Sequence, residues 1–132
     1  MKKLLFSIVL VLGYFAGYTQ GNVLDPLDVA KIKQVGSITA SEGNWAAFTV
    51  SVQSDPLKEN KPAHSELHLL NLDTKETTPF ITSGSVRSIA FRPGKSSITF
   101  LSRRAGDNST SLYEIPLAGG EAAKIYEFDY SI

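Results

Sequence analysis

The residues best suited to acid–base chemistry or metal binding are the two histidines, His64 and His68, in the run His-Ser-Glu-Leu-His. A spacing of four aligns side chains on a helix, whereas this stretch has the composition of a loop running into a strand, so we expect no metal site there. The sequence also lacks the Gly-x-Ser-x-Gly turn on which α/β-hydrolases place their nucleophilic serine, and no strand–turn–helix unit surrounds a serine that could pair with either histidine. The chain is therefore predicted to contain no catalytic, cofactor-binding or metal-ligating residues.

Two further groups have chemistry of their own. Arg103 and Arg104 are able to clamp a peptide carboxylate through paired hydrogen bonds, although a basic pair that closes a strand is more often a solvated edge. Asn108-Ser109-Thr110 matches an N-glycosylation sequon, but together with Asp107 it also has the composition of a polar turn, which is the interpretation we favour.

Composition limits the class of protein. The 132 residues are 42% hydrophobic and 20% charged, as expected for one globular domain. Thirteen basic and thirteen acidic residues cancel, and removal of Lys2 and Lys3 with a leader leaves 11 against 13, so neither nucleic acid nor anionic lipid is an expected partner. Cysteine is absent, which excludes disulfides and thiolate metal sites within this chain.

The first 21 residues have the order of a secretory signal. Lys2 and Lys3 precede an apolar run over residues 4–16, and small and polar residues follow over 17–21. The run is shorter than the roughly 20 residues that cross a bilayer. We therefore expect export to the periplasm or the medium, cleavage between about Gln20 and Asn22, and no membrane attachment afterwards.

A short capped helix is predicted within residues 22–34. Asp25 is placed to cap it, Pro26 suits the first helical position, and Asp28 adds negative charge to the first turn. Leu24 and Val29 stand where a hydrophobic staple would pack, and we expect the helix to run to about Lys33 before Gly36 ends it.

The remainder of the chain consists of two similar units, over residues 35–84 and 85–128. A turn followed by an apolar strand occurs at residues 41–48 and again at 93–100, and residues 67–72 match 112–117. The spacing of roughly 45 to 52 residues is typical of propeller blades. Four strands are predicted in each unit, at about 35–40, 45–52, 66–72 and 77–82, then at 86–92, 98–103, 111–117 and 122–127.

The two units differ mainly in the segment between their second and third strands. In the first unit this segment, residues 54–62, contains two prolines and four charged residues. It is either a tolerated solvated insertion or a loop that reaches a neighbouring domain or a substrate.

The opening helix from Leu24 to Val29, the run from Lys31 to Val35 and the segment 41–51 resemble the start of exported acylaminoacyl-peptidases and dipeptidyl aminopeptidases of the prolyl oligopeptidase family. Residues 91–104 resemble that family's repeated Trp-Ser-Pro-Asp-Gly-Lys-x-Ile-Ala-Phe-Leu-Ser motif, which TolB-like periplasmic propellers share. Ser41 stands in place of the motif's proline in the first copy, and Gly94-Lys95 in place of Asp-Gly in the second.

The resemblance implies an all-β fold of two four-stranded antiparallel blades of an incomplete, TolB-like β-propeller, with residues 129–132 beginning a third blade. It also implies a C-terminal α/β-hydrolase domain as partner, which would hold the catalytic residues and the peptide substrate while the blades restrict entry. Two alternatives remain open. The chain is instead a piece of a periplasmic TolB-like module that binds proteins, or it is complete and self-assembles.

Two blades cannot close a ring, because propellers use at least four. We therefore expect apolar open flanks and self-association. The residues expected to line these flanks are Trp45, Phe48, Ile89, Phe91, Ile98 and Phe100.

Overall fold

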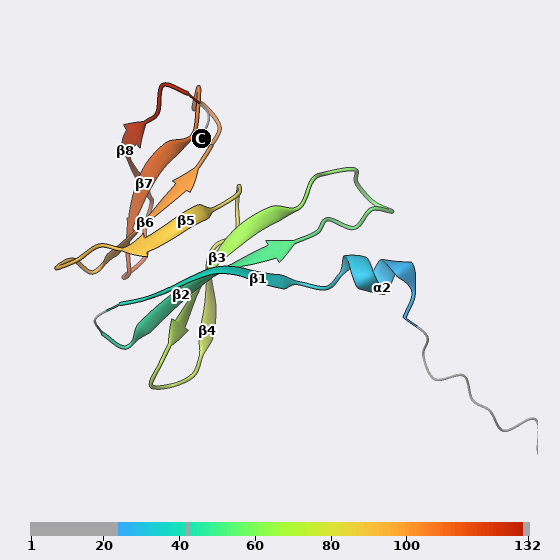
Figure 1. Ribbon diagram of the computed structural model, residues 1–132, viewed down its shortest axis with the longest axis horizontal. Helices are drawn as coiled ribbons and strands as arrows, with labels where there is room; N and C mark the ends of the chain where they lie inside the picture. Colours follow the sequence, from blue (N-terminus) through green and yellow to red (C-terminus); the bar gives the residue numbers. More distant parts are fainter. Residues whose placement is uncertain (1–23, 42, 131–132) are drawn as a thin grey trace, which may run out of the picture.

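The computed structural model describes residues 24–41 and 43–130; the expected signal segment and residues 131–132 lie outside the described residues. Within them, eight strands form two four-stranded antiparallel sheets in chain order, preceded by one short helix (Figure 1). The predicted all-β class is thus confirmed. None of the described helical residues forms a segment long and apolar enough to span a bilayer.

Helix α2 (Pro26–Ala30) begins as the sequence predicts. The Leu27 N–H donates to Asp25 Oδ1 at 3.2 Å. Asp25 and Asp28, the third helical residue, also form a capping box, in which the Asp25 N–H donates to Asp28 Oδ2 at 3.2 Å. The helix ends earlier than predicted, with Lys31 as its C-cap. The predicted staple is wrong, because Leu24 and Val29 are both largely exposed; so short a helix at the edge of the molecule offers them no surface to pack on.

The first sheet consists of β1 (Gln34–Ala40), β2 (Trp45–Val52), β3 (His64–Asn71) and β4 (Thr77–Ile81). The prediction that Gly36 ends the helix is wrong. Gly36 lies in β1, where the register shifts between Val35 and Ile38. A Cβ at Gly36 would come within 2.7 Å of Thr49 Oγ1 on the neighbouring strand. A side chain at this position would have to displace the Thr49 hydroxyl, so the close approach of β1 to β2 favours glycine.

The second sheet consists of β5 (Arg87–Phe91), β6 (Ser97–Ser102), β7 (Ser111–Pro116) and β8 (Ala123–Glu127). All eight predicted strands exist, and their ends agree with the predictions within two residues. The largest difference lies at β3, which begins at His64 rather than at residue 66.

One hydrophobic core lies between the two sheets. Successive strand residues point to opposite faces, and directly paired residues share a face, so the register fixes which side chains meet. We call the packed surfaces the two inner faces. That of the first sheet carries Ala47, Thr49, Leu67, Leu69 and Ile81, and that of the second carries Ile98, Phe100, Ser102, Tyr113 and Ile115; all ten are buried.

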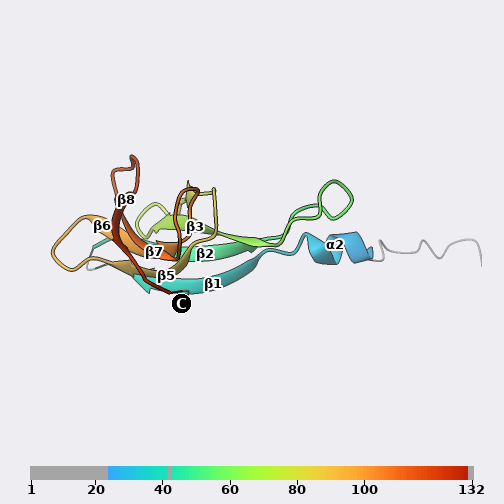
Figure 2. The ribbon, with the colours of Figure 1, turned by 90° about the horizontal axis from the view of Figure 1, so that it is seen from above.

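Strands β1 and β5 lie beside each other where the sheets meet, and the sheets diverge from this line (Figures 1 and 2). Val86, which leads into β5, is buried in the same core, and its N–H donates to the Ser65 carbonyl of β3 at 2.8 Å. The chain thus passes from one sheet to the next with its backbone hydrogen-bonded and its side chain covered.

The two sheets repeat each other in detail. The first strand of each sheet has an irregular register at the matching place, between Val35 and Ile38 in β1 and between Arg87 and Ala90 in β5. The pairing of the third strand with the fourth matches as well: the β3–β4 register shifts at residues 67–68, and the β7–β8 register shifts at residues 112–113. A repeat that extends to its bulges is one structural unit used twice.

Candidate interaction surfaces

A stacked ring pair occupies the same place in each sheet. Phe48 and His68 are paired across β2 and β3, with ring centroids 5.6 Å apart and planes inclined by 21°. Phe100 and Tyr113 are paired across β6 and β7, at 5.7 Å and 17°. In the second sheet this pair is buried against the first sheet, whereas in the first sheet the matching pair lies on the opposite, uncovered face.

The two inner faces are therefore not matching surfaces. Leu67 on the inner face of the first sheet matches Leu112, and Ile81 matches Tyr126, both of which lie on the uncovered side of the second sheet. Conversely, Phe100 on the inner face of the second sheet matches Phe48 on the uncovered side of the first. One face of the unit thus packs on the opposite face of the next unit, which is head-to-tail packing.

We call the uncovered surfaces the outer faces. On the outer face of the first sheet lie Val35, Ile38, Phe48, Val50, Glu66, His68 and Leu70. Val50 is buried within this face, at 7% exposure. The outer face of the second sheet carries Ala90, Thr99, Leu101, Leu112, Glu114 and Tyr126. Ile38 is 71% exposed and Tyr126 is 53% exposed.

The predicted composition of the open flanks is mostly wrong. Ile89, Ile98 and Phe100 are buried in the core, and Trp45 and Phe91 are half-buried against it. Of the residues predicted there, only Phe48 lies on an outer face. The reason is the two-residue period of the strand: the even-numbered positions of β6 face the first sheet, so they cannot also face solvent.

Both histidines contact the same carboxylate on the outer face of the first sheet. His64 Nε2 lies 3.5 Å from Glu66 Oε1, and His68 Nε2 lies 3.0 Å from Glu66 Oε2. Their residues alternate along β3, so the three side chains share a face, an arrangement that the helical spacing argument overlooked. The described residues hold no group of three His, Asp or Glu arranged to bind a metal ion, and none of their serine hydroxyls is hydrogen-bonded to an imidazole.

A charged cluster, which we call the Asp107 cluster, closes one end of the inner face of the second sheet. The Asp107 carboxylate accepts hydrogen bonds from the Tyr113 hydroxyl at 2.7 Å and from the Arg104 N–H at 2.8 Å, and Lys124 Nζ lies 2.6 Å from it. The Asp107 side chain is only 3% exposed. These donors, Lys124 first, lower the pKa of Asp107 to about 2, and the same contact raises the pKa of Lys124.

The two arginines considered as a carboxylate clamp are separated by the structure. Arg103 is exposed, whereas the Arg104 guanidinium lies over the rings of Tyr113 and Phe100, 4.6 and 5.6 Å from their centroids. Arg104 thus covers the stacked pair of the second sheet through a cation–π contact. Arg104 therefore packs on rings of its own sheet.

The residues of the sequon lie in a turn tied to β8 and the segment after it. The Asn108 N–H donates to Glu127 Oε1 at 2.8 Å, and the Ser109 hydroxyl donates to the Phe128 carbonyl. Asn108 is exposed, but Thr110 is buried. The turn joins β6 and β7 at the end of the sheet that holds the Asp107 cluster.

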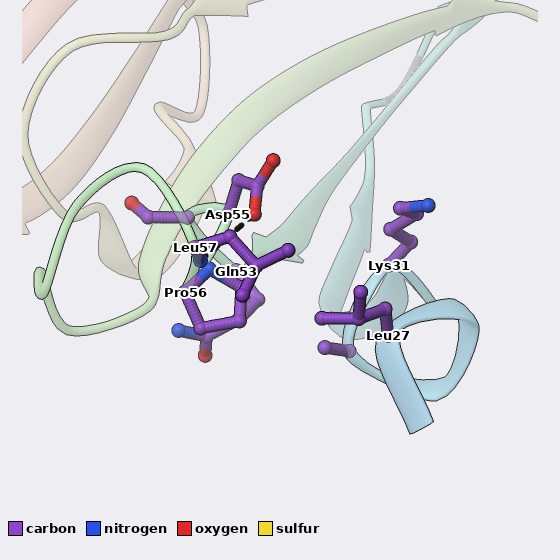
Figure 3. A pocket seen from close by; sticks show the side chains of 8 residues that line it. Leu27, Lys31, Gln53, Asp55, Pro56 and Leu57 are labelled. Carbon is purple, nitrogen blue, oxygen red and sulfur yellow. Dashed lines mark hydrogen bonds between the residues drawn. The ribbon is translucent and has the colours of Figure 1, made fainter. Parts of the chain in front are cut away.

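A small hollow lies between α2 and the segment that joins β2 to β3. Figure 3 shows Leu27 and Lys31 on one side and Gln53, Pro56 and Leu57 on the other. Beside it, Asp55 caps its own turn by accepting the Leu57 N–H at 3.0 Å, as Asp25 does for Leu27 at the start of α2. Its volume of about 190 Å³ is below the range of about 300–1,000 Å³ typical of ligand pockets.

Comparisons with protein-family models, with curated proteins and with solved structures gave no match.

Proposed function

We propose that the two sheets are consecutive blades of a β-propeller, and that they form the N-terminal part of an exported serine peptidase of the prolyl oligopeptidase family. The head-to-tail packing carries the propeller part of this proposal. A unit that presents one face to the opposite face of its successor leaves a matching pair of faces at the two ends of the series. In a propeller, the neighbouring blades would cover both of these faces.

The chain after β8 supports a third blade. The Phe128 N–H donates to the Thr110 carbonyl at 3.1 Å, just as the Val86 N–H donates to the Ser65 carbonyl between the first two sheets. Val86 is buried by the second sheet, whereas Phe128 is half-buried at the edge of an outer face. Phe128 therefore stands where the chain would enter the next blade, which supports the proposal that residues 129–132 begin one.

In the proposed peptidase these blades would line the passage to a C-terminal α/β-hydrolase domain. That domain would supply the nucleophile and bind the peptide, while the ring of blades limits which peptides enter. Strand β2 and strand β3 continue into the segment 53–63, which extends beyond the sheet beside α2 (Figure 1). This projection is where we propose contact with the neighbouring domain.

An antibody against residues 24–130 tests the proposal in cells of the source organism. Envelope and medium fractions are treated with a fluorophosphonate probe, which labels activated serines, and the antigen is then captured. We expect a captured polypeptide much longer than 132 residues that carries the label. A long captured polypeptide without label, in a fraction where other serine hydrolases are labelled, would refute the peptidase and favour a TolB-like binding module.

A further inference from the structure

Each outer face includes large apolar side chains that are exposed to water, although Val50 on that of the first sheet is buried. Ile38 and Val35 on the first sheet are 71% and 65% exposed, and Tyr126 on the second is 53% exposed. In contrast, Ile81, which matches Tyr126, is 6% exposed because the second sheet covers it. The same structural position is thus buried at the interface between the sheets and exposed to solvent on the outer face of the second sheet.

The outer face of the second sheet is expected to fit the outer face of the first, because each occupies the positions that match an inner face, and the two inner faces fit each other. Leu112 on the outer face of the second sheet matches the inner-face Leu67, and the Phe48–His68 pair on the outer face of the first sheet matches the inner-face Phe100–Tyr113 pair. Docking the outer face of the second sheet on the outer face of the first sheet of another copy repeats the contact already made inside one chain. No partner of different chemistry is needed to cover either surface.

Two carboxylates lie in the surfaces that would meet: Glu66 on the outer face of the first sheet, which His64 and His68 contact, and Glu114. Glu114 stands on the outer face of the second sheet where the inner face of the first has Leu69. The Ser97 hydroxyl donates to Glu114 Oε1 at 2.6 Å, and the Arg92 guanidinium binds the other carboxylate oxygen. Ser97 first, and then the Arg92 charge, lower the pKa of Glu114. The carboxylate therefore enters the contact with its partners already in place, which reduces the cost of covering it.

We propose that copies of this chain, taken without the further blades that would otherwise cover its outer faces, bind one another head to tail. The outer face of the second sheet of one copy covers the outer face of the first sheet of the next, until the series closes into a ring. The inference rests on the propeller part of the proposed function and not on the peptidase part. Closed propellers contain about four to eight blades, so two sheets per copy give rings of two to four copies. An isologous dimer, made by one outer face on itself, would not repeat the contact between the two sheets.

Two substitutions block the two faces separately. Ile38→Asp places a charge on the outer face of the first sheet, and Tyr126→Asp places one on the outer face of the second. Both side chains are exposed, so the single chain should keep its fold, which circular dichroism checks. Leu57→Asp is the matched control, because Leu57 is 76% exposed but lies on neither sheet.

Light scattering after size-exclusion chromatography measures the mass of each purified chain. We expect the unaltered chain and Leu57→Asp to have the mass of two to four copies, and each blocked variant to have the mass of one. A mixture of Ile38→Asp and Tyr126→Asp should form a one-to-one dimer, since one intact pair of faces remains.

Three results would overturn the proposal. They are a monomeric unaltered chain at concentrations near 1 mM, a blocked variant that still forms a dimer by itself, and a mixture that stays monomeric while the unaltered chain assembles. Val35→Asp serves as a second block of the first sheet if Ile38→Asp fails to fold. Any of these failures would leave the capture of a labelled peptidase, described above, unaffected.

Discussion

Phe100 and Phe48 provide a matched pair of mutations that measures how much the packing between the sheets contributes to stability. Both are phenylalanines on the second strand of a sheet, and both stack on a ring across the next strand. Phe100 is fully buried between the sheets, whereas Phe48 is half-buried on an outer face. The two alanine variants therefore differ chiefly in whether a second sheet covers the position.

Phe100→Ala should lower the free energy of unfolding by about 3–5 kcal/mol, because it removes a buried ring and leaves a cavity. Phe48→Ala should lower it by only about 1 kcal/mol, roughly half the value of burying a whole side chain, because an open face leaves no cavity. With an m-value of about 1.5 kcal/mol/M in urea, the midpoint should fall by roughly 2–3 M for Phe100→Ala and by less than about 1 M for Phe48→Ala.

Urea unfolding followed by circular dichroism gives both values, with Tyr126→Asp present in every chain so that a second copy does not cover Phe48. If Phe100→Ala is unfolded in water, Ile98→Val replaces it, with an expected loss of about 0.5–1.5 kcal/mol against almost none for Ile38→Val on the outer face. Equal losses at Phe100 and Phe48 would refute the reasoning, since they would mean that the two sheets do not cover each other.

Three further outcomes are expected. The folded-state pKa of Asp107, about 2, lies below the ordinary value of 3.8, so the stability that this group adds is present above about pH 4 and is lost as the pH falls toward 2. In Asp107→Asn the thermal midpoint should therefore fall less between pH 4 and pH 2 than in the unaltered chain. The exposed control Asp129→Asn should show the same fall as the unaltered chain. Produced in a bacterium with its leader, the protein should leave the cytoplasm shortened by about twenty residues, and an exported chain still beginning at Met1 would contradict this. The purified chain should not react with a fluorophosphonate probe, and labelling that disappears when one serine is mutated would reveal an activated serine.

Much of the secondary structure is predictable because it depends on local chemistry. Alternating apolar residues and β-branched side chains mark the strands, and Asp25-Pro26 marks the start of α2. The end of α2 was not predictable in this way, because no C-terminal signal stands near Lys31, and Gly36 serves a close approach between strands rather than a helix end.

The faces of the sheets were harder to predict, because an error of one residue in register exchanges the buried and exposed sides. Phe100 was expected on an open flank, yet the pairing of Phe100 with Tyr113 places both against the first sheet. The alignment of Phe48 with Phe100 was visible in the sequence, but not that one packs inward and the other outward. That contrast depends on how one unit follows the next in space.

The Asp107 cluster is likewise a product of tertiary structure. Asp107, Arg104 and Tyr113 are close in sequence, but Lys124 comes from β8 on the far edge of the sheet. Composition indicates a polar turn at 107–110, and nothing in the spacing indicates that its carboxylate is covered. Only the antiparallel return of β8 beside β7 brings the Lys124 ammonium to it.

The packing of the two inner faces is tested most directly by nuclear Overhauser contacts in the monomeric Tyr126→Asp chain. We predict cross-peaks between the methyl groups of Leu67 and Leu69 and the ring protons of Phe100 and Tyr113, because these four side chains belong to one buried core. Cross-peaks of the two rings with each other and with the second sheet alone, and none with the leucine methyl groups, would contradict the account.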